Sequence, residues 1–202
     1  MRAHWMAAEL ELEYESKLVG SRSGTTQTDA FRGLNAKEKI PVLVDGDLVL
    51  SESAAIVTYL GDTYGPESLL VPKAYSQRRA KYNEWISFIQ MELDAHTLYV
   101  MRKHQDLADL YGEAPAAIAE AIAGFNKQIR VANTQLEATA YLLGDAFTAA
   151  DLLLSTCLDW AVAYQIELSP ALESYRKTIH QRPAFQSASK HNFSITPNQD
   201  AF

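Results

Sequence analysis

Two different patterns of apolar and polar positions meet near residue 70 of the chain. Before that point the apolar residues come in short runs, which predict short helices and strands. Helices are predicted over 2–12, 28–34 and 53–60, the last one ending at Gly61, and a strand is predicted over 13–18. The apolar runs 41–45 and 48–50 flank Gly46 and Asp47, a pattern typical of a β-hairpin. The first part of the chain is therefore expected to be a small α/β unit.

After a proline-containing linker, the pattern becomes helical. Tyr82, Trp85, Ile89 and Leu93 recur at the spacing of one helix face, and residues 118–136 repeat that spacing on a second long helix. Segment 149–166 is apolar almost all round, which predicts a helix at the centre of a bundle. We therefore expect an α/β domain over 1–64, a linker over 65–74 and an all-helical domain over 75–202.

Composition narrows the class of protein. The 202 residues include 18 basic and 25 acidic ones, a net charge of −7, which disfavours binding to nucleic acid or to an anionic membrane. No apolar run is long enough to span a bilayer, and the first residues lack the pattern of a signal peptide. Cys157 is the single cysteine, which fits a reducing compartment, and the five histidines have no metal-ligand spacing. These features predict a soluble cytoplasmic protein without a metal site.

The segment from Asn35 to Gly46, followed by Ser51-Glu52-Ser53-Ala-Ala-Ile56, carries the most specific motif. It resembles the signature of the glutathione transferase family, in which Asn-Pro-x-Gly-Lys-Val-Pro-x-Leu precedes Gln/Glu-Ser-x-Ala-Ile. Ala36 and Glu38 depart from the proline and glycine of that pattern. The resemblance implies a thioredoxin-like domain followed by a helical domain, a cis peptide bond before Pro41, and glutathione as co-substrate.

The same resemblance implies a set of glutathione-binding residues: Lys39, Ile40, Pro41, Glu52 and Ser53. The backbone of Ile40 would pair with the cysteinyl residue, and Lys39 would meet the glycyl carboxylate. Ser53, at a helix N-terminus, suits the γ-glutamyl carboxylate, and Glu52 suits the γ-glutamyl ammonium. Taken singly, Ser53 is equally a helix cap, Lys39 a solvated side chain and Pro41 a trans proline.

Two further groups of residues are singled out in the helical part. The segment Gly144 to Asp151 resembles the family's Gly-x-x-Phe-Thr/Ser-x-Ala-Asp motif, in which Thr148 and Asp151 form a structural capping box. Tyr99 and Arg102 lie near the end of the first long helix, which lines the substrate cleft in relatives. A solvated helix face is the alternative interpretation of these two residues.

The resemblance begins at the family's first helix, so the first strand of the fold and the loop with the thiol-activating Tyr, Ser or Cys have no counterpart in this sequence. No catalytic residue can be named, and a chain that starts too late is the simplest explanation. The strand over 13–18 and the strand over 41–45 would then lack the partner that joins them. The leading hypothesis is a homodimeric glutathione transferase that acts on small hydrophobic electrophiles. The alternatives are a non-catalytic binding or scaffolding protein and a relative with different glutathione chemistry.

Overall fold

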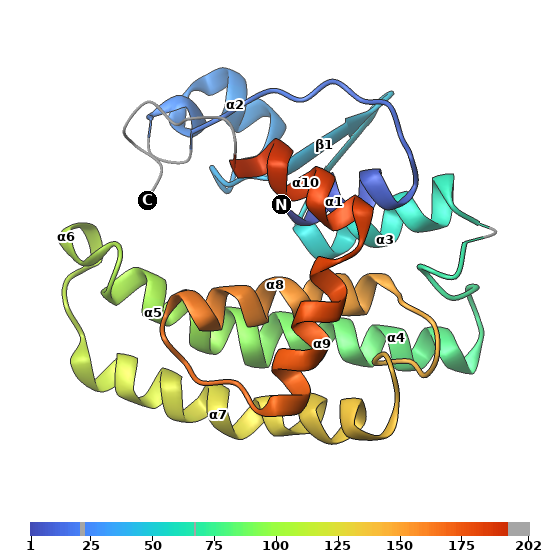
Figure 1. The fold of residues 1–202 in the computed structure, drawn as a ribbon. Coiled ribbons are helices and arrows are strands. Elements are labelled where there is room, and N and C mark those ends of the chain that lie inside the picture. Colours follow the sequence, from blue (N-terminus) through green and yellow to red (C-terminus); the bar gives the residue numbers. More distant parts are fainter. Residues whose placement is uncertain (21–22, 67, 194–202) are drawn as a thin grey trace. The chain divides into compact units, whose positions relative to one another are not determined.

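The computed structural model describes residues 1–20, 23–66 and 68–193 (Figure 1). The chain forms two compact units. Unit 1 runs from Met1 to Gly65 and resumes at Pro183, whereas unit 2 runs from Pro66 to Arg182. The segment expected to form one helical domain, 75–202, is therefore divided, because its last helix packs with the first unit. Residues 194–202 of that segment lie outside the described residues.

Unit 1 contains one β-hairpin with helices on either side of it in the sequence. Its elements are α1 (Arg2–Glu9), the 3₁₀ turn η1 (Thr25–Gln27), α2 (Asp29–Leu34), β1 (Val42–Asp45), β2 (Leu48–Ser51), α3 (Ser53–Tyr64) and α10 (Pro183–Phe193). The hairpin prediction is confirmed: β1 and β2 are antiparallel, with Val42 opposite Ser51 and Asp45 opposite Leu48. Gly46 has a φ of 56°, which a glycine adopts without steric cost.

The predicted end of α3 at Gly61 is wrong, because the helix continues to Tyr64. The hydroxyl of Tyr59 donates to Oδ2 of Asp45 over 2.7 Å, and the hydroxyl of Tyr64 donates to the same oxygen. These two bonds join the last turns of α3 to the end of β1. A glycine inside a helix costs about 1 kcal/mol, and the tertiary contacts on both sides of Gly61 keep the helix continuous.

The strand predicted over 13–18 is also wrong. This segment carries no ladder, and its side chains are mostly exposed, with Tyr14 at 48% and Leu18 at 71%. In the described part of unit 1 the sheet consists of β1 and β2 alone. A strand needs a neighbouring strand for its backbone N–H and C=O groups, and the described part of unit 1 pairs none with this segment.

The core of unit 1 is formed where α1 packs against α3 and α10. Trp5, Met6, Ile56 and Val57 are fully buried. The ring of Phe185 from α10 meets the Trp5 indole edge to face, with centroids 4.8 Å apart. Such aromatic pairs add to the free energy gained by burying their apolar area. Helix α10 is thus part of the core of the first unit although it comes last in the sequence.

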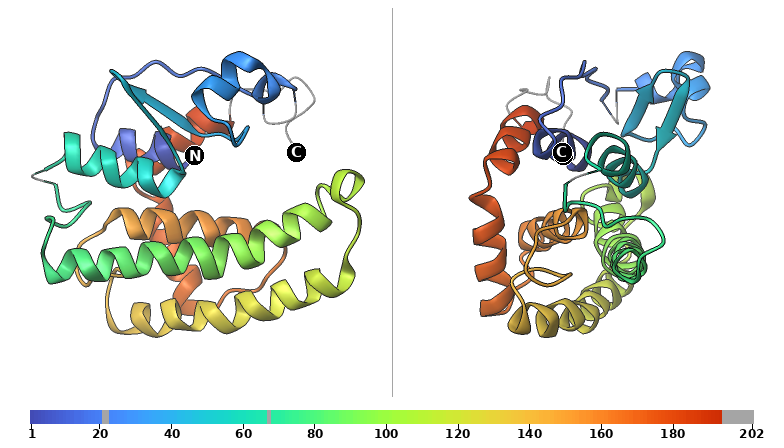
Figure 2. Two further views of the ribbon diagram at one scale, coloured as in Figure 1. Left: turned by 180° about the vertical axis from the view of Figure 1, so that it is seen from behind. Right: turned by 90° about the vertical axis from the view of Figure 1, so that its right-hand side faces the viewer.

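Unit 2 is all helical, as expected. Its elements are α4 (Gln77–Phe88), the π-helical segment η2 (Ile89–Leu98), α5 (Tyr99–His104), α6 (Ala108–Tyr111), α7 (Pro115–Ala138), α8 (Ala149–Ala163) and α9 (Pro170–His180). The first three form one continuous rod, and α7 lies alongside η2 and α5 in both views of Figure 2. Pro115 and Pro170 each occupy the first turn of a helix, where the missing N–H costs no hydrogen bond.

Helix α8 is the centre of unit 2 and is buried along nearly its whole length, as its all-round apolar sequence predicted. Thr148 and Asp151 form a capping box at its start. Oδ2 of Asp151 accepts from the backbone N–H of Thr148 over 2.9 Å and from its hydroxyl over 2.8 Å. Oδ1 accepts from the backbone N–H of Leu142 and from the Tyr175 hydroxyl, both over 2.9 Å. The fully buried carboxylate therefore joins three segments of unit 2.

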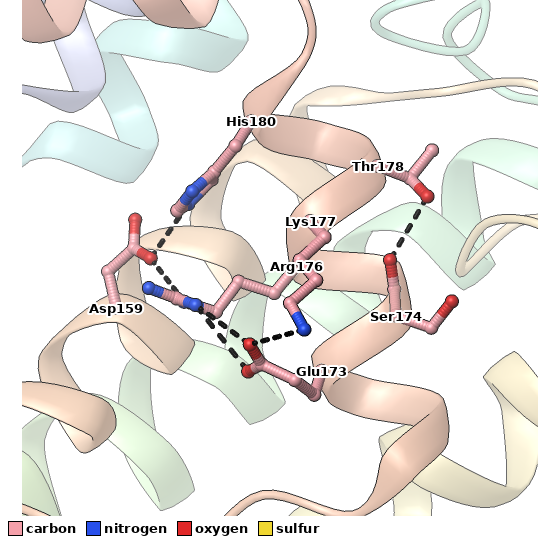
Figure 3. Close-up of polar contacts among 7 residues, drawn as sticks. All are labelled: Asp159, Glu173, Ser174, Arg176, Lys177, Thr178 and His180. Carbon is pink, nitrogen blue, oxygen red and sulfur yellow. Dashed lines mark hydrogen bonds and ion pairs between the residues drawn. The ribbon is translucent and has the colours of Figure 1, made fainter.

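A half-buried polar network joins the far end of α8 to α9 (Figure 3). Oδ1 of Asp159 accepts from Nε of Arg176 over 2.7 Å and lies 2.8 Å from Nε2 of His180. Glu173 pairs with Arg176 and Lys177 along α9. Apolar packing and this network together fix α9 on α8.

Among the described residues, no helix combines the length and the apolar character needed to cross a membrane.

Candidate functional site

The loop from Asn35 to Pro41 is held in place by one buried side chain. Asn35 is 6% exposed, and its Nδ2 donates to the carbonyl oxygen of Lys39 over 2.7 Å. Its Oδ1 accepts from the backbone N–H of Lys37 over 3.1 Å. Glu38 occupies the motif's glycine position and has a φ of 56°, so the backbone keeps a conformation that suits glycine. Asn35 therefore positions the residues that the sequence motif singled out.

The peptide bond between Ile40 and Pro41 is cis, as expected from the motif. The Ile40 side chain is 46% exposed, and Lys39 and Pro41 are exposed as well. Strand β1 begins directly afterwards, at Val42. The loop thus presents the backbone of Ile40 at the start of a strand.

Glu52 and Ser53 form the second part of the site, at the junction of β2 and α3. Glu52 has φ 71° and ψ 115°, a conformation that residues other than glycine rarely adopt. Backbone strain of this kind costs about 1–3 kcal/mol and is concentrated at functional sites. Ser53 is the first residue of α3, so the unpaired N–H groups of the helix start here.

The register of the hairpin brings these two parts together. Because Val42 lies opposite Ser51, the residues before β1 and the residues after β2 flank the same end of the hairpin. We call the set Lys39, Ile40, Pro41, Glu52 and Ser53 the hairpin-end site. The five residues chosen from the motif therefore lie at the same end of the hairpin.

Two basic side chains complete the polar surroundings of the hairpin-end site. Nζ of Lys37 lies 2.5 Å from Oε1 of Glu52, and Nη1 of Arg2 donates to the Ser53 hydroxyl over 3.2 Å. Neither role is predicted by the sequence motif. Lys37 stands two residues before Lys39 in the motif, which is a signal for its role, whereas nothing in the local pattern connects Arg2 with Ser53.

Tyr99 and Arg102 lie in unit 2, on α5. Nζ of Lys103 lies 5.4 Å from the ring centre of Tyr99 and 5.5 Å from that of Tyr111. A cavity of about 520 Å³ is lined by residues of α4 and α7, among them Trp85 and Val131, and one of about 360 Å³ by residues of η2 and α7. Neither Tyr99 nor Arg102 lines either cavity. Their assignment as substrate contacts stays a prediction.

In the described part of the chain, neither the cysteine nor any tyrosine with a resolved pKa shift is suited to activating a thiol. Cys157 is fully buried in α8. Every resolved shift in the pKa of a tyrosine is upward: burial raises those of Tyr14, Tyr164 and Tyr175, and the hydrogen bond to Asp45 raises those of Tyr59 and Tyr64. Within the described ranges, no three His, Cys, Asp or Glu residues gather as metal ligands.

Comparisons with known proteins find the same family in both halves of the chain. Residues 1–63 match the model of the glutathione S-transferase N-terminal domain, and residues 88–183 match that of the C-terminal domain. Glutathione S-transferase Z1 of Arabidopsis thaliana is 31% identical over 187 residues, covering 88% of this chain and 80% of that protein.

Solved structures that resemble this chain are also glutathione transferases. A glutathione transferase from Methylococcus capsulatus superposes with a TM-score of 0.81 at 29% identity, covering 96% of this chain and 94% of that one. The theta class glutathione S-transferase of Xanthomonas axonopodis, solved with glutathione bound, has a TM-score of 0.77 at 28% identity, with coverages of 93% and 89%. These similarities confirm a thioredoxin-like N-terminal domain with few strands and an all-helical C-terminal domain.

Proposed function

The chain belongs to the glutathione S-transferase family, and from this premise we propose that it binds glutathione at the hairpin-end site and conjugates it to small hydrophobic electrophiles. In this reaction the sulfur of the glutathione thiolate attacks an electrophilic carbon, and a leaving group departs or a double bond is saturated. The thiolate is the reactive form, since the thiol is a poor nucleophile.

Five residues would hold the tripeptide. The backbone of Ile40, exposed before the cis Pro41, pairs with the extended cysteinyl residue as an added strand would. Lys39 meets the glycyl carboxylate. Glu52 accepts from the γ-glutamyl ammonium, and Ser53 with the first N–H groups of α3 donates to the γ-glutamyl carboxylate.

The observation that carries this proposal is the conformation of Glu52. Its φ of 71° is unfavourable for a glutamate, and a glycine would adopt it more easily. A role of the Glu52 carboxylate in binding a cationic group of a ligand explains why a glutamate stands at this position. The Xanthomonas relative with glutathione bound supports the choice of ligand.

The second substrate would lie against the helical domain, with Tyr99 and Arg102 as contacts. A homodimer, in which domain one of each subunit meets the helices of the other, is part of this proposal. So are the domain limits 1–64, 65–74 and 75–202, taken as limits along the sequence, with α10 packed in the first unit. The family resemblance supports these limits and the homodimer. We also propose a cytoplasmic location, which the composition supports.

The second candidate function is glutathione binding without turnover. It is favoured by one specific observation: in the described residues Cys157 is fully buried, and every resolved shift in the pKa of a tyrosine is upward. In that case the protein would be a non-catalytic binding or scaffolding protein.

The test is calorimetric titration with glutathione, together with a conjugation assay on chlorodinitrobenzene and haloalkanes. The free energy of unfolding should rise with glutathione concentration, because a ligand that binds only the folded state stabilises it. Glu52→Gln should weaken glutathione binding about tenfold or more, because a charge-assisted hydrogen bond is lost.

Glu15→Gln is the matched control, since Glu15 is an exposed glutamate of the same unit outside the site. Binding with product formation supports the transferase. Binding without product supports the non-catalytic function. If glutathione neither binds nor stabilises the protein, conjugation and glutathione binding without turnover are both excluded, and a purely scaffolding role is favoured.

A further inference from the structure

Two histidine rings meet where α1 packs against α10 in unit 1. His4 lies on α1 and His191 on α10, and their ring centres are 4.5 Å apart, with the ring planes inclined by 54°. The two residues come from opposite ends of the sequence, so the spacing of histidines along the chain does not predict this contact. Neither ring has a role in the glutathione chemistry proposed above.

One nitrogen of each ring lies against a hydroxyl group. Nδ1 of His4 lies 2.8 Å from the hydroxyl oxygen of Tyr14, and Nε2 of His191 lies 3.1 Å from that of Ser16. Among the described residues, the other nitrogen of each ring makes no hydrogen bond. Each ring is therefore held through one nitrogen and keeps the second nitrogen for a ligand.

Protein metal sites hold histidine in this way. A neutral imidazole binds the metal ion through one nitrogen, while its other nitrogen bonds to a polar group that fixes the orientation of the ring. Here the hydroxyls of Tyr14 and Ser16 have the orienting role. An unperturbed imidazole is mostly neutral at about pH 7.5, so protons compete little with a metal ion there.

The separation of the two rings is compatible with a shared ion. Metal–nitrogen bonds of about 2.0–2.1 Å place two imidazole nitrogens on one ion about 3 Å apart. Rings whose centres are 4.5 Å apart can bring one nitrogen each to that distance, and their inclination of 54° excludes a parallel stack, in which the lone pairs cannot converge. Both histidines are half-buried beside the exposed Tyr14 and Ser16, so a hydrated ion can reach them.

We propose that His4 and His191 together bind one divalent transition-metal ion that prefers imidazole ligands, such as Zn²⁺, with water at its remaining positions. Tyr14 and Ser16 are the positioning residues of this site. Imidazole suits zinc, copper and nickel, whereas magnesium and calcium prefer oxygen ligands. The bound ion joins α1 to α10 and thereby stabilises unit 1. This inference does not depend on the proposed function.

The experiment is calorimetric titration of the untagged full chain with zinc chloride, without glutathione, because thiols also bind zinc. One ion should bind per chain and raise the unfolding temperature, and magnesium chloride should do neither. His4→Gln and His191→Gln should each weaken zinc binding about 10–100-fold or more. His96→Gln is the matched control, since His96 lies on η2 in unit 2, and it should leave the affinity unchanged.

Tyr14→Phe tests the positioning role. It removes one oxygen atom and keeps both imidazoles, so zinc should bind about 10–100-fold more weakly to a ring that has lost its orienting partner. X-ray absorption of the unaltered, zinc-loaded chain should show two imidazole nitrogens at about 2.0–2.1 Å from the metal. That measurement needs no variant, so it decides the question even where a substitution unfolds unit 1.

Three results would overturn the inference. The first is that the unaltered chain does not bind zinc at millimolar concentration. The second is that His4→Gln or His191→Gln binds zinc as tightly as the unaltered chain. The third is an absorption spectrum with fewer than two imidazole ligands. An unchanged affinity of Tyr14→Phe would refute the role of its hydroxyl. The proposed glutathione binding stands in every case, because the hairpin-end site contains neither histidine.

Discussion

At the scale of single residues, the carboxylate of Asp151 is a buried acceptor shared by several segments of unit 2. It accepts four hydrogen bonds, from two backbone N–H groups, one threonine hydroxyl and one tyrosine hydroxyl. Burial raises the pKa of this carboxyl, and the hydrogen bonds oppose that rise. A buried acceptor with all its oxygens in use is costly to replace, because its donors would be left unpaired.

We expect Asp151→Ala to lower the free energy of unfolding by about 3 kcal/mol, through loss of the cap and of the buried partners. Thr148→Ala removes only the hydroxyl and should cost about 1 kcal/mol. The exposed neighbour Asp145 is the control, and Asp145→Ala should change stability by less than about 0.5 kcal/mol. Urea unfolding measures all three. Equal values for Asp151→Ala and Asp145→Ala would contradict the capping role.

Separation along the sequence decides which of these contacts the sequence pattern predicts. Thr148 and Asp151 are three residues apart, so a local motif reveals their bond. Arg2 and Ser53 are 51 residues apart, and only the packing of α1 on α3 joins them. Lys37 and Glu52 are brought together by the hairpin, whose register the sequence suggests but does not determine.

At the scale of elements, the connection between the hairpin and α3 depends on Asp45. The hydrogen bonds from Tyr64 and Tyr59 lower the pKa of Asp45, and the bond to Asp45 raises that of Tyr64 to about 12. Both hydrogen bonds therefore form only while Asp45 is ionised and both tyrosines are protonated. Asp45 lies at the opposite end of the hairpin from Ser51 and the hairpin-end site.

These two hydrogen bonds make the free energy of unfolding depend on pH. The sign of this dependence follows from the shifts in the pKa of Tyr64 and of Asp45. A tyrosine with a raised pKa contributes stability below its unfolded value of about 10, and loses it as pH rises toward the folded value. Asp45, whose pKa is lowered, contributes stability above about 4 and loses it as pH falls. The difference in unfolding free energy between the protein and Tyr64→Phe should therefore be largest near neutral pH and shrink above about pH 10.

Denaturant unfolding from pH 7 to 11 measures this difference. Tyr75 is fully exposed, so Tyr75→Phe serves as the control and should show no such trend. A difference for Tyr64→Phe that stays constant across the range would mean that the bond to Asp45 does not contribute to stability.

Local pattern predicted most elements but not their exact limits or their partners. The hairpin and the long helices follow from apolar spacing. The extended segment 13–18 has the alternation of a strand, yet a strand forms only where a neighbour supplies hydrogen bonds. The π-helical turns of η2 were not predicted, because apolar spacing along a long helix barely distinguishes i→i−5 from i→i−4 bonding.

At the scale of the whole molecule, α10 completes a unit that begins at the other end of the sequence. Phe185 covers Trp5, whereas Phe193 on the same helix is 59% exposed. Phe185→Ala should lower the stability of unit 1 by about 2 kcal/mol, because an aromatic contact and apolar burial are lost. Phe193→Ala should change it by less than about 0.5 kcal/mol.

The fluorescence of Trp5 reports on the unfolding of unit 1 once the other two tryptophans, Trp85 and Trp160, are replaced by phenylalanine. Its emission in a denaturant titration should show an earlier transition for Phe185→Ala than for Phe193→Ala. Coincident transitions would show that α10 does not stabilise unit 1.

The return of α10 to the first unit also orders events during synthesis. Domains usually fold in sequence order, the N-terminal one first, as the chain leaves the ribosome. Here residues 1–65 emerge first, but the helix that covers Trp5 is translated only after the whole of unit 2. The helical unit can therefore finish folding while the first unit still exposes its core, so the part that carries the hairpin-end site is completed last on the ribosome.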